Sequence, residues 1–252
     1  MEKFINKIAR KLYDSKRGQL EDHIVVLPSR RAGTFFKQAL SELNDTPIWM
    51  PKIYSIEEWL EELSGYLIVD RMTLLFEMYD SYKSVFPKKE QDSFESFLKW
   101  APTLLTDYND IDAYLERPQT LFNYLHQAKK IEAWAPLDEK PSKLVKNYLR
   151  FWELMGLLFI DFKKRLKTQN IAFQGMAYRK AFNNINSWVL KNKPEKKTIC
   201  YVGFNAMNPC EEGIMRFLIA EDIAEAFWDA DTYYLKDEKQ EAGRYLRQHK
   251  LW

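Results

Sequence analysis

Two strongly apolar runs, one near each end of the chain, indicate buried β-strands. "HIVVLP" covers residues 23–28 and "TICYVGF" covers residues 198–204. Neither run alternates with polar residues, so both sides of each strand are expected to be covered, as in a parallel sheet. Two shorter runs, "IWMPKIYS" at 48–55 and "IAEAFWDAD" at 223–231, predict further strands.

Amphipathic stretches at helical spacing alternate with these strands. Residues 2–15 place Phe4, Ile8 and Leu12 on one face, which predicts a first helix. A second helix is expected to start after Ser29, whose hydroxyl is suited to capping its N-terminus. "SIEEWLEELSG" predicts a third, with Ser55 as N-cap, Glu58 three residues later and Gly65 at its end. "PCEEGIMRFLIAE" predicts another, with Pro209 in its first turn.

The middle of the chain shows helical periodicity almost throughout. The clearest stretches are "VDRMTLLFEMYDSYKSVF", "SFESFLKWAPTLLTDYNDI", "PQTLFNYLHQAKKIEAW" and "SKLVKNYLRFWELMGLLFIDFKKRLKTQ". "MAYRKAFNNINSWVLKN" predicts one more helix before the strands return.

This order predicts an α/β fold whose parallel sheet is interrupted by a large all-α insertion. The expected segments are 1–66 and 191–252 for the α/β domain and 67–190 for the insertion. The chain should leave and re-enter the sheet domain near Gly65 and Pro194, and the strands in "HIVVLP" and "TICYVGF" should share one sheet. The alternative is a series of three mixed segments without a common sheet.

Composition limits the kinds of partner and the cellular compartment that we expect for the protein. The chain has 252 residues, 46% of them hydrophobic, so it can bury a sizeable core. A net charge of +2 creates no global field for nucleic acid, and any such site must be a local patch. The two cysteines, Cys200 and Cys210, fit a reducing compartment. No apolar run approaches the ~20 residues of a membrane span, so we expect a soluble cytoplasmic protein without a membrane partner.

The sequence contains no recognisable motif for a metal site or for a catalytic nucleophile. The three histidines lie far apart, and there is no His-Glu-x-x-His, Cys-x-x-Cys or Gly-x-Ser-x-Gly pattern. Acidic residues crowd the segment "DYNDIDAYLE", and their spacing is loosely similar to that of a calcium loop, but the required glycine is absent. A solvated helix face is the favoured interpretation of these four residues: Asp107, Asp110, Asp112 and Glu116.

A basic stretch between residues 161 and 197 raises the possibility of nucleic-acid binding. Phe162, Phe173 and Tyr178 are interleaved with its cations, and aromatic rings can stack on bases while cations neutralise phosphates. The competing interpretation is an ordinary charged surface above core aromatics. The cations are Lys163, Lys164, Arg165, Lys167, Arg179, Lys180, Lys191, Lys193, Lys196 and Lys197.

Arg30 and Arg31 follow the first predicted strand, at the kind of edge where α/β proteins meet ligands. Cations at a helix N-terminus oppose the helix dipole, so a compensating carboxylate or a nucleic acid is expected beside them.

Several segments together resemble the AddB-like branch of the UvrD-type helicases, the partner subunits of helicase–nucleases that process double-strand breaks. The segments are "IVVLPSRRAGTFF", "MPKIYSIEEWL", "FLKWAPTLLTDYNDIDAYL", "IAFQGMAYRKAF", "YVGFNAMNPCEEGIMRFL" and "AFWDADTYYL". They occur in the family's order and span about residues 4–246. The resemblance implies a P-loop-helicase-like domain at the N-terminus of a protein that ends in a PD-(D/E)XK nuclease domain.

The chain departs from active members of that family at both nucleotide motifs. The residues before "HIVVLP" contain no Gly-Lys-Ser/Thr, so the loop that would wrap a triphosphate is missing. Val202 and Gly203 occupy the position of the Asp-Glu pair that would hold magnesium, and Glu211 and Glu212 come later, as first-turn helix charges. We therefore expect no ATPase activity, no cofactor and no catalytic residue in this chain.

The nuclease motifs have no counterpart here either. Asp229 and Asp231 occur without the Glu-x-Lys that should follow them, and the sequence stops within "RYLRQHKLW". These features predict an N-terminal fragment of a longer nuclease-type protein.

The resemblance and the basic residues together predict a non-catalytic DNA-repair domain. It would guide single-stranded or forked DNA and dock an AddA-type helicase–nuclease subunit. Arg30 and Arg31 would line one wall of a groove and the basic stretch the other, with Phe173 or Tyr178 stacking on bases. The expected DNA contacts are Arg30, Arg31, Lys163, Lys164, Arg165, Lys167, Arg179 and Lys180. The alternative is a protein-interaction scaffold that does not bind DNA.

Overall fold

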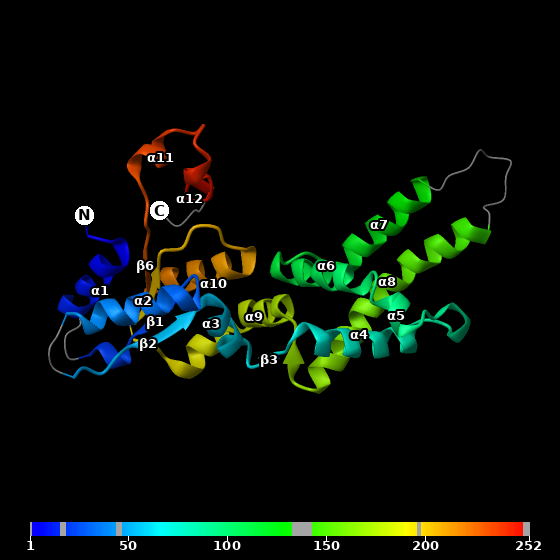
Figure 1. The fold of residues 1–252 in the computed structure, drawn as a ribbon, viewed down its shortest axis with the longest axis horizontal. Helices are drawn as coiled ribbons and strands as arrows, with labels where there is room; N and C mark the ends of the chain where they lie inside the picture. The colour runs from blue at the N-terminus through cyan, green and yellow to red at the C-terminus, as the bar shows by residue number, and fades with distance from the viewer. Residues whose placement is uncertain (1, 16–18, 44–46, 133–142, 196–197, 249–252) are drawn as a thin grey trace. The chain divides into compact units, whose positions relative to one another are not determined.

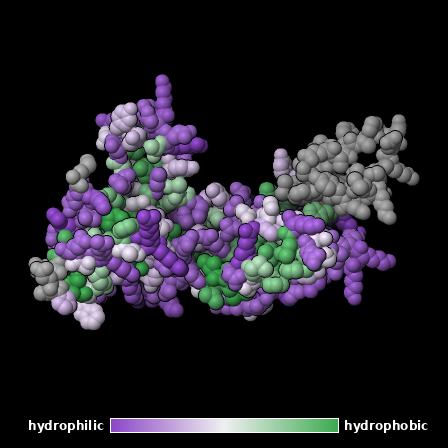
Figure 2. Space-filling view, in the orientation of Figure 1, coloured by the Kyte–Doolittle hydropathy of each residue, from purple (hydrophilic) through white to green (hydrophobic). Residues whose placement is uncertain are grey.

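Two compact units make up the chain in the computed structural model (Figure 1). The first combines Met1–Ser64 with Lys180–Trp252, and the second is Gly65–Arg179. The structure describes residues 2–15, 19–43, 47–132, 143–195 and 198–248. None of the helices in these ranges is both long and apolar enough to cross a lipid bilayer. On the face shown in Figure 2 the surface is mostly hydrophilic, with apolar residues exposed within each unit.

A four-stranded parallel sheet forms the centre of the first unit, in the order β2-β1-β5-β6. The prediction that "HIVVLP" and "TICYVGF" share one sheet is confirmed, because β1 and β5 pair directly, with Val25 opposite Cys200. The α/β class and the parallel sheet are therefore confirmed as well. The strands are β1 (Ile24–Leu27), β2 (Lys52–Ser55), β5 (Ile199–Val202) and β6 (Ala224–Phe227).

Helices cover both faces of this sheet, which explains why β1 and β5 are apolar throughout. On one face, α1 (Phe4–Ser15) and α2 (Arg30–Ser41) share a core with side chains of Leu27 and Val202. On the other face, Trp59 of α3 (Ile56–Ser64) donates a hydrogen bond from Nε1 to the Tyr201 hydroxyl at 3.1 Å. α9 (Gln174–Asn192) packs beside α3 through an edge-to-face contact of Trp188 with Trp59.

The helix between β5 and β6 belongs to that second face. Because β2 and β6 lie on opposite sides of the β1–β5 pair, right-handed crossovers place α2 and α10 (Pro209–Ala220) on opposite faces. Gly213 of α10 lies directly against the Phe182 ring of α9, which leaves no room for a Cβ at this position. Two short helices follow the sheet: α11 (Thr232–Lys236) and α12 (Arg244–Gln248).

The predicted helix ends of the first unit are confirmed in detail. The Ser29 hydroxyl accepts a hydrogen bond from the backbone N–H of Ala32, which caps α2. At α3, Ser55 and Glu58 cap each other's backbone N–H groups, at 2.9 Å and 3.3 Å. Gly65 ends that helix with a φ of +68°, a left-handed conformation that glycine adopts without strain.

Among the residues that the structure describes, the second unit is mainly helical and contains one short pair of strands. β3 (Leu67–Ile68) and β4 (Ile171–Ala172) pair in parallel, so the expectation of an all-α segment is wrong in this detail. Strands of two residues are too short to show alternation in the sequence. The helices are α4 (Arg71–Val85), α5 (Phe94–Phe97), α6 (Ala101–Ala113), α7 (Pro118–Glu132) and α8 (Lys143–Thr168).

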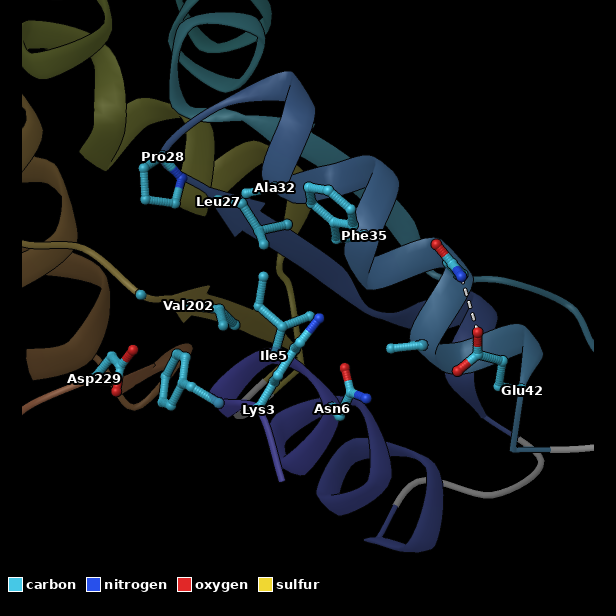
Figure 3. A pocket seen from close by; sticks show the side chains of 14 residues that line it. Lys3, Ile5, Asn6, Leu27, Pro28, Ala32, Phe35, Glu42, Val202 and Asp229 are labelled. Carbon is cyan, nitrogen blue, oxygen red and sulfur yellow. Dashed lines mark hydrogen bonds between the residues drawn. The ribbon is translucent and has the colours of Figure 1, made fainter. Parts of the chain in front are cut away.

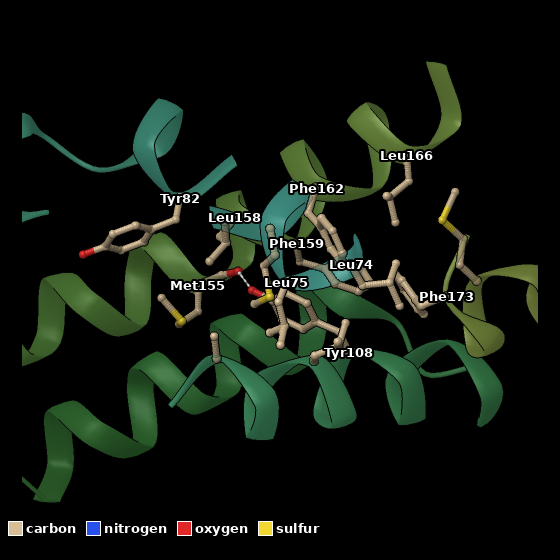
Figure 4. Packing of buried hydrophobic residues seen from close by; sticks show 14 of the residues in the cluster. Leu74, Leu75, Tyr82, Tyr108, Met155, Leu158, Phe159, Phe162, Leu166 and Phe173 are labelled. Atoms are coloured by element: carbon tan, nitrogen blue, oxygen red, sulfur yellow. Dashed lines mark hydrogen bonds between the residues drawn. The ribbon is translucent and has the colours of Figure 1, made fainter. Parts of the chain in front are cut away.

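An aromatic-rich core holds the helices of the second unit together (Figure 4). Tyr108 of α6 is fully buried, packs edge-to-face on Phe159 of α8, and donates a hydrogen bond to the Met155 carbonyl at 2.7 Å. The compact units divide within α9, between Arg179 and Lys180, whereas the sequence placed the boundary at 190. The helical periodicity continues without a break across residues 179 and 180, so the sequence pattern does not indicate the division between the units.

Candidate functional site

The most distinctive feature of the first unit is a pocket at the carboxyl end of its sheet. The chain runs from β1 outward to β2 and from β5 outward to β6, so the strand order reverses between β1 and β5. The loops that leave the two central strands diverge at such a point, and open α/β sheets bind ligands there. A cavity of about 640 Å³ lies at this position, next to Leu27 and Val202, which end β1 and β5, and next to Pro28 and Gly203, which follow these strands.

Two helices supply the side walls of this pocket (Figure 3). Ile5 and Asn6 face it from the first turn of α1, and Lys3 from just before that helix. Ala32 and Phe35 face it from α2. The charged side chains near it are Lys3, Glu42 and Asp229, and Glu42 accepts a hydrogen bond from Gln38 at 2.9 Å.

The backbone around the pocket does not form a phosphate cradle. Pro28, which follows β1, has no N–H to donate, and Ser29 uses its side chain to cap α2. Gly203 has a φ of +75° and lies close to Phe4, where an added Cβ would be 3.4 Å from the ring. Glycine therefore serves the turn and the packing of α1 at this position.

Two of the acidic residues near this edge, Glu211 and Asp231, cap helices. Glu211 and Asn208 form a reciprocal capping box at the start of α10, at 2.9 Å and 3.0 Å, and Glu212 also lies in its first turn, as predicted. Asp231 caps α11 by accepting from the Tyr233 N–H at 2.8 Å. Within the residues that the structure describes, no group of three or more His, Cys, Asp or Glu side chains is arranged to hold a metal ion.

Arg30 lies beside a carboxylate, one of the two partners expected for a cation at a helix N-terminus. Its Nε lies 2.9 Å from Oε1 of Glu58, while the guanidinium stays largely exposed to solvent. The hydrogen bond donated by the Ser55 backbone N–H is the main reason why the pKa of Glu58 lies below its ordinary value, and Arg30 lowers it further. The sequence interpretation missed this partner, because Glu58 had been assigned only to the cap of α3.

Arg31 differs from its neighbour, because it makes no ion pair with any residue that the structure describes. Its guanidinium lies over the ring of Phe35, 5.7 Å from the centroid. Phe35 is 48% exposed and faces the pocket from α2. Residues four apart share a helix face, so the sequence did contain the signal for this pair, although we did not identify it there.

Two of the predicted DNA contacts are instead partners of a buried carboxylate in the second unit. Asp112 is completely buried, with Lys163 Nζ 2.6 Å from Oδ2 and Arg179 Nε 2.7 Å from Oδ1. The Arg179 Nε–H is close enough for an ion pair but makes no hydrogen bond. The interpretation of Asp112 as part of a solvated helix face is therefore wrong. Its charge is buried because two cations from α8 and α9 converge on it.

Arg179 also closes the end of α6. Its Nη2 donates to the carbonyls of Ile111 and Glu116, at 2.7 Å and 2.6 Å. Between these two carbonyls the chain passes through Leu115, which has a left-handed φ of 59°. The Arg179 side chain is thus engaged on three sides within its own unit.

Arg165 is likewise paired, with Glu77 at 2.7 Å and Asp80 at 2.8 Å, which joins α8 to α4. The hydrogen bonds that Arg165 donates to these carboxylates raise its pKa, with Asp80 contributing more than Glu77. Lys164 and Lys167 are exposed and make no ion pair with the described residues, and Lys180 is half-buried. Lys191 and Lys193 lie at the end of α9, and Lys196 and Lys197 fall outside the described residues.

The three aromatic residues considered for stacking on bases, Phe162, Phe173 and Tyr178, are buried. Phe162 and Phe173 are buried and stack on each other with centroids 5.8 Å apart. Tyr178 is also buried, and its hydroxyl accepts a hydrogen bond from Gln174 Nε2 at 2.7 Å. The predicted stacking role of Phe173 or Tyr178 is wrong, because the hydrophobic face of each helix takes these rings into the core. A groove between the arginines and the basic stretch stays a prediction.

In comparisons with known proteins, no family model and no curated protein matches the chain.

Proposed function

We propose that this chain is a non-catalytic, helicase-like part of an AddB-type DNA-repair protein, and that it guides single-stranded DNA along the carboxyl edge of its sheet. The observation that carries the proposal is the pairing of exposed Arg31 with exposed Phe35 beside the pocket at the strand-order reversal. A cation next to an open aromatic ring is the combination that single-strand binding proteins use.

The chemistry of the pocket favours a guiding role over a motor role. The side chain of Val202 has no oxygen with which to hold magnesium, and the turn after β1 begins with a proline instead of a glycine-rich loop. The nuclease activity that the family resemblance implies would belong to another domain of such a protein, and docking of an AddA-type subunit forms part of the same proposal.

The ion pairs reduce the set of residues that we propose for DNA. Lys163, Arg165 and Arg179 serve the second unit internally. Arg31, which makes no ion pair with the described residues, therefore becomes the main candidate for a phosphate contact. Arg30 stays a candidate because its guanidinium is largely exposed although it pairs with Glu58, and Lys164 and Lys167 are additional ones. The same observation supports the second candidate function, a protein-interaction scaffold, because so many of the cations already have carboxylate partners.

Replacing Phe35 with alanine should weaken binding of a short oligo-dT by about 5- to 150-fold, since stacking one base on an aromatic ring contributes ~1–3 kcal/mol. The measurement is fluorescence anisotropy with a labelled oligonucleotide at fixed salt. Phe35→Trp should retain binding because it preserves an aromatic surface.

The matched control is Phe76→Ala, which removes another exposed phenylalanine, 55% accessible, from the second unit. This variant should bind oligo-dT like the wild type. Equal affinities for Phe35→Ala and Phe76→Ala would mean that Phe35 does not contact DNA, and would favour the scaffold function.

A further inference from the structure

The second unit contains a pocket of its own, formed by α6, α7 and α8. It has a volume of about 380 Å³, and Ile111, Phe122 and Met155 provide part of its apolar wall. Tyr114, at the end of α6, lines it with a side chain that is 57% exposed. An accessible aromatic ring next to an apolar cavity is a feature of surfaces that receive a side chain from another molecule.

The charged side chains that line this pocket are all acidic among the residues that the structure describes. Asp107, Asp110 and Glu116 line it, and none of the described residues that line it is a lysine, arginine or histidine. Asp107 and Asp110 have no cationic partner within the described part of the chain. Partial burial and, secondarily, the neighbouring Asp110 carboxylate raise the pKa of Asp107, which is the direction expected of a carboxylate that lacks a counter-ion.

The wall that carries these groups is held in place by the buried ion pairs described above. Arg179 donates to the carbonyls of Ile111 and Glu116, on either side of Tyr114. The backbone N–H of Glu116 also donates to the Ile111 carbonyl at 3.0 Å. The turn that presents Tyr114 and Glu116 is therefore fixed before any ligand arrives, which lowers the entropic cost of binding.

We propose that this pocket docks an arginine side chain from a basic segment of a partner protein. A planar guanidinium matches both parts of the site, because it stacks on aromatic rings and donates in a fork to carboxylates. The methylene groups of the arginine would cover the apolar wall. Nucleic acid is the wrong occupant, because its phosphates would meet three carboxylates. The proposal thus goes beyond the DNA contact suggested for the first unit and does not depend on it.

The test uses two labelled peptides and the full chain. One peptide carries two arginines in an alanine–leucine background, and the other carries citrulline, the neutral isostere of arginine, at both positions. Fluorescence anisotropy should show that the arginine peptide binds at least about tenfold more tightly, because the hydrogen bonds lost are charge-assisted. Asp107→Asn/Asp110→Asn should remove this preference, and Tyr114→Ala should weaken binding of the arginine peptide several-fold.

A matched control separates docking from general attraction between opposite charges. Glu238→Gln/Glu241→Gln removes the same number of negative charges, at the same spacing, from exposed positions of the first unit. It should leave the affinity for the arginine peptide unchanged. Equal binding of the two peptides, no binding of either, or the same loss in both double variants would overturn the proposal. Agmatine that binds as tightly as the peptide would show a small-cation site and would also overturn it.

Discussion

Replacing Asp112 with alanine should lower the free energy of unfolding of the second unit by about 3–5 kcal/mol. The change removes a fully buried carboxylate and leaves Lys163 and Arg179 facing each other without a counter-ion. Burial already lowers the pKa of Lys163, and Asp112 is what opposes that effect. Urea denaturation followed by circular dichroism, fitted with a separate transition for each unit, measures the loss.

Asp110→Ala is the matched control for Asp112→Ala, because Asp110 lies on the same helix and is exposed. It should change the free energy of unfolding by no more than about 0.5 kcal/mol. A triple variant, Asp112→Leu/Lys163→Met/Arg179→Met, should recover much of the lost stability, since apolar residues can replace a buried ion cluster. An Asp112→Ala protein as stable as the Asp110→Ala protein would show that the buried charges do not support the unit.

Replacing Trp59 with alanine should destabilise the first unit by about 3–5 kcal/mol. Trp59 is 1% exposed, and its Nε1 donates to the hydroxyl of Tyr201 on the central strand β5. Its ring packs on Trp188 of α9 with centroids 5.5 Å apart. The variant therefore opens a cavity on one face of the sheet and leaves the Tyr201 hydroxyl, which is buried, without its donor.

Trp49 provides the control for this variant, because it is a tryptophan close to Trp59 in sequence but is 80% exposed. Trp49→Ala should change the free energy of unfolding by no more than about 0.5 kcal/mol. Thermal unfolding of the two variants, followed by circular dichroism, makes the comparison. If both lose the same small amount, α3 does not depend on its contact with β5.

The elements of the first unit could be predicted because each has a local cause. "HIVVLP" and "TICYVGF" are apolar enough to require cover on both sides, and Ser29, Ser55 and Gly65 mark helix ends by their own chemistry. The two-residue strands β3 and β4 could not be found in this way, because their pairing joins residues that are about a hundred positions apart. The division of the units within α9 likewise depends on contacts between distant segments.

The candidate site was predicted only in outline. Its place after β1 followed from the strand and the two arginines, but the partners of those arginines depend on the fold. Arg30 meets Glu58 because α2 and α3 both begin at the carboxyl edge of the paired strands β1 and β2. Asp112 meets Lys163 and Arg179 from helices far apart in sequence. A count of basic residues cannot separate exposed cations from those that neutralise a buried acid. The structure makes that distinction by the distances between their atoms.

The salt dependence of oligo-dT binding tests the proposed DNA contact most directly. Anisotropy titrations between about 50 and 200 mM NaCl give the slope of log affinity against log salt for the wild type and for Arg30→Ala/Arg31→Ala. We expect the double variant to bind more weakly, with a slope flatter by up to about 1.4, the value for two phosphates of a single strand. Lys88→Ala/Lys89→Ala, an equal charge change at exposed positions, should keep the wild-type slope. A wild type that does not bind, or a double variant with unchanged affinity and slope, would contradict the account.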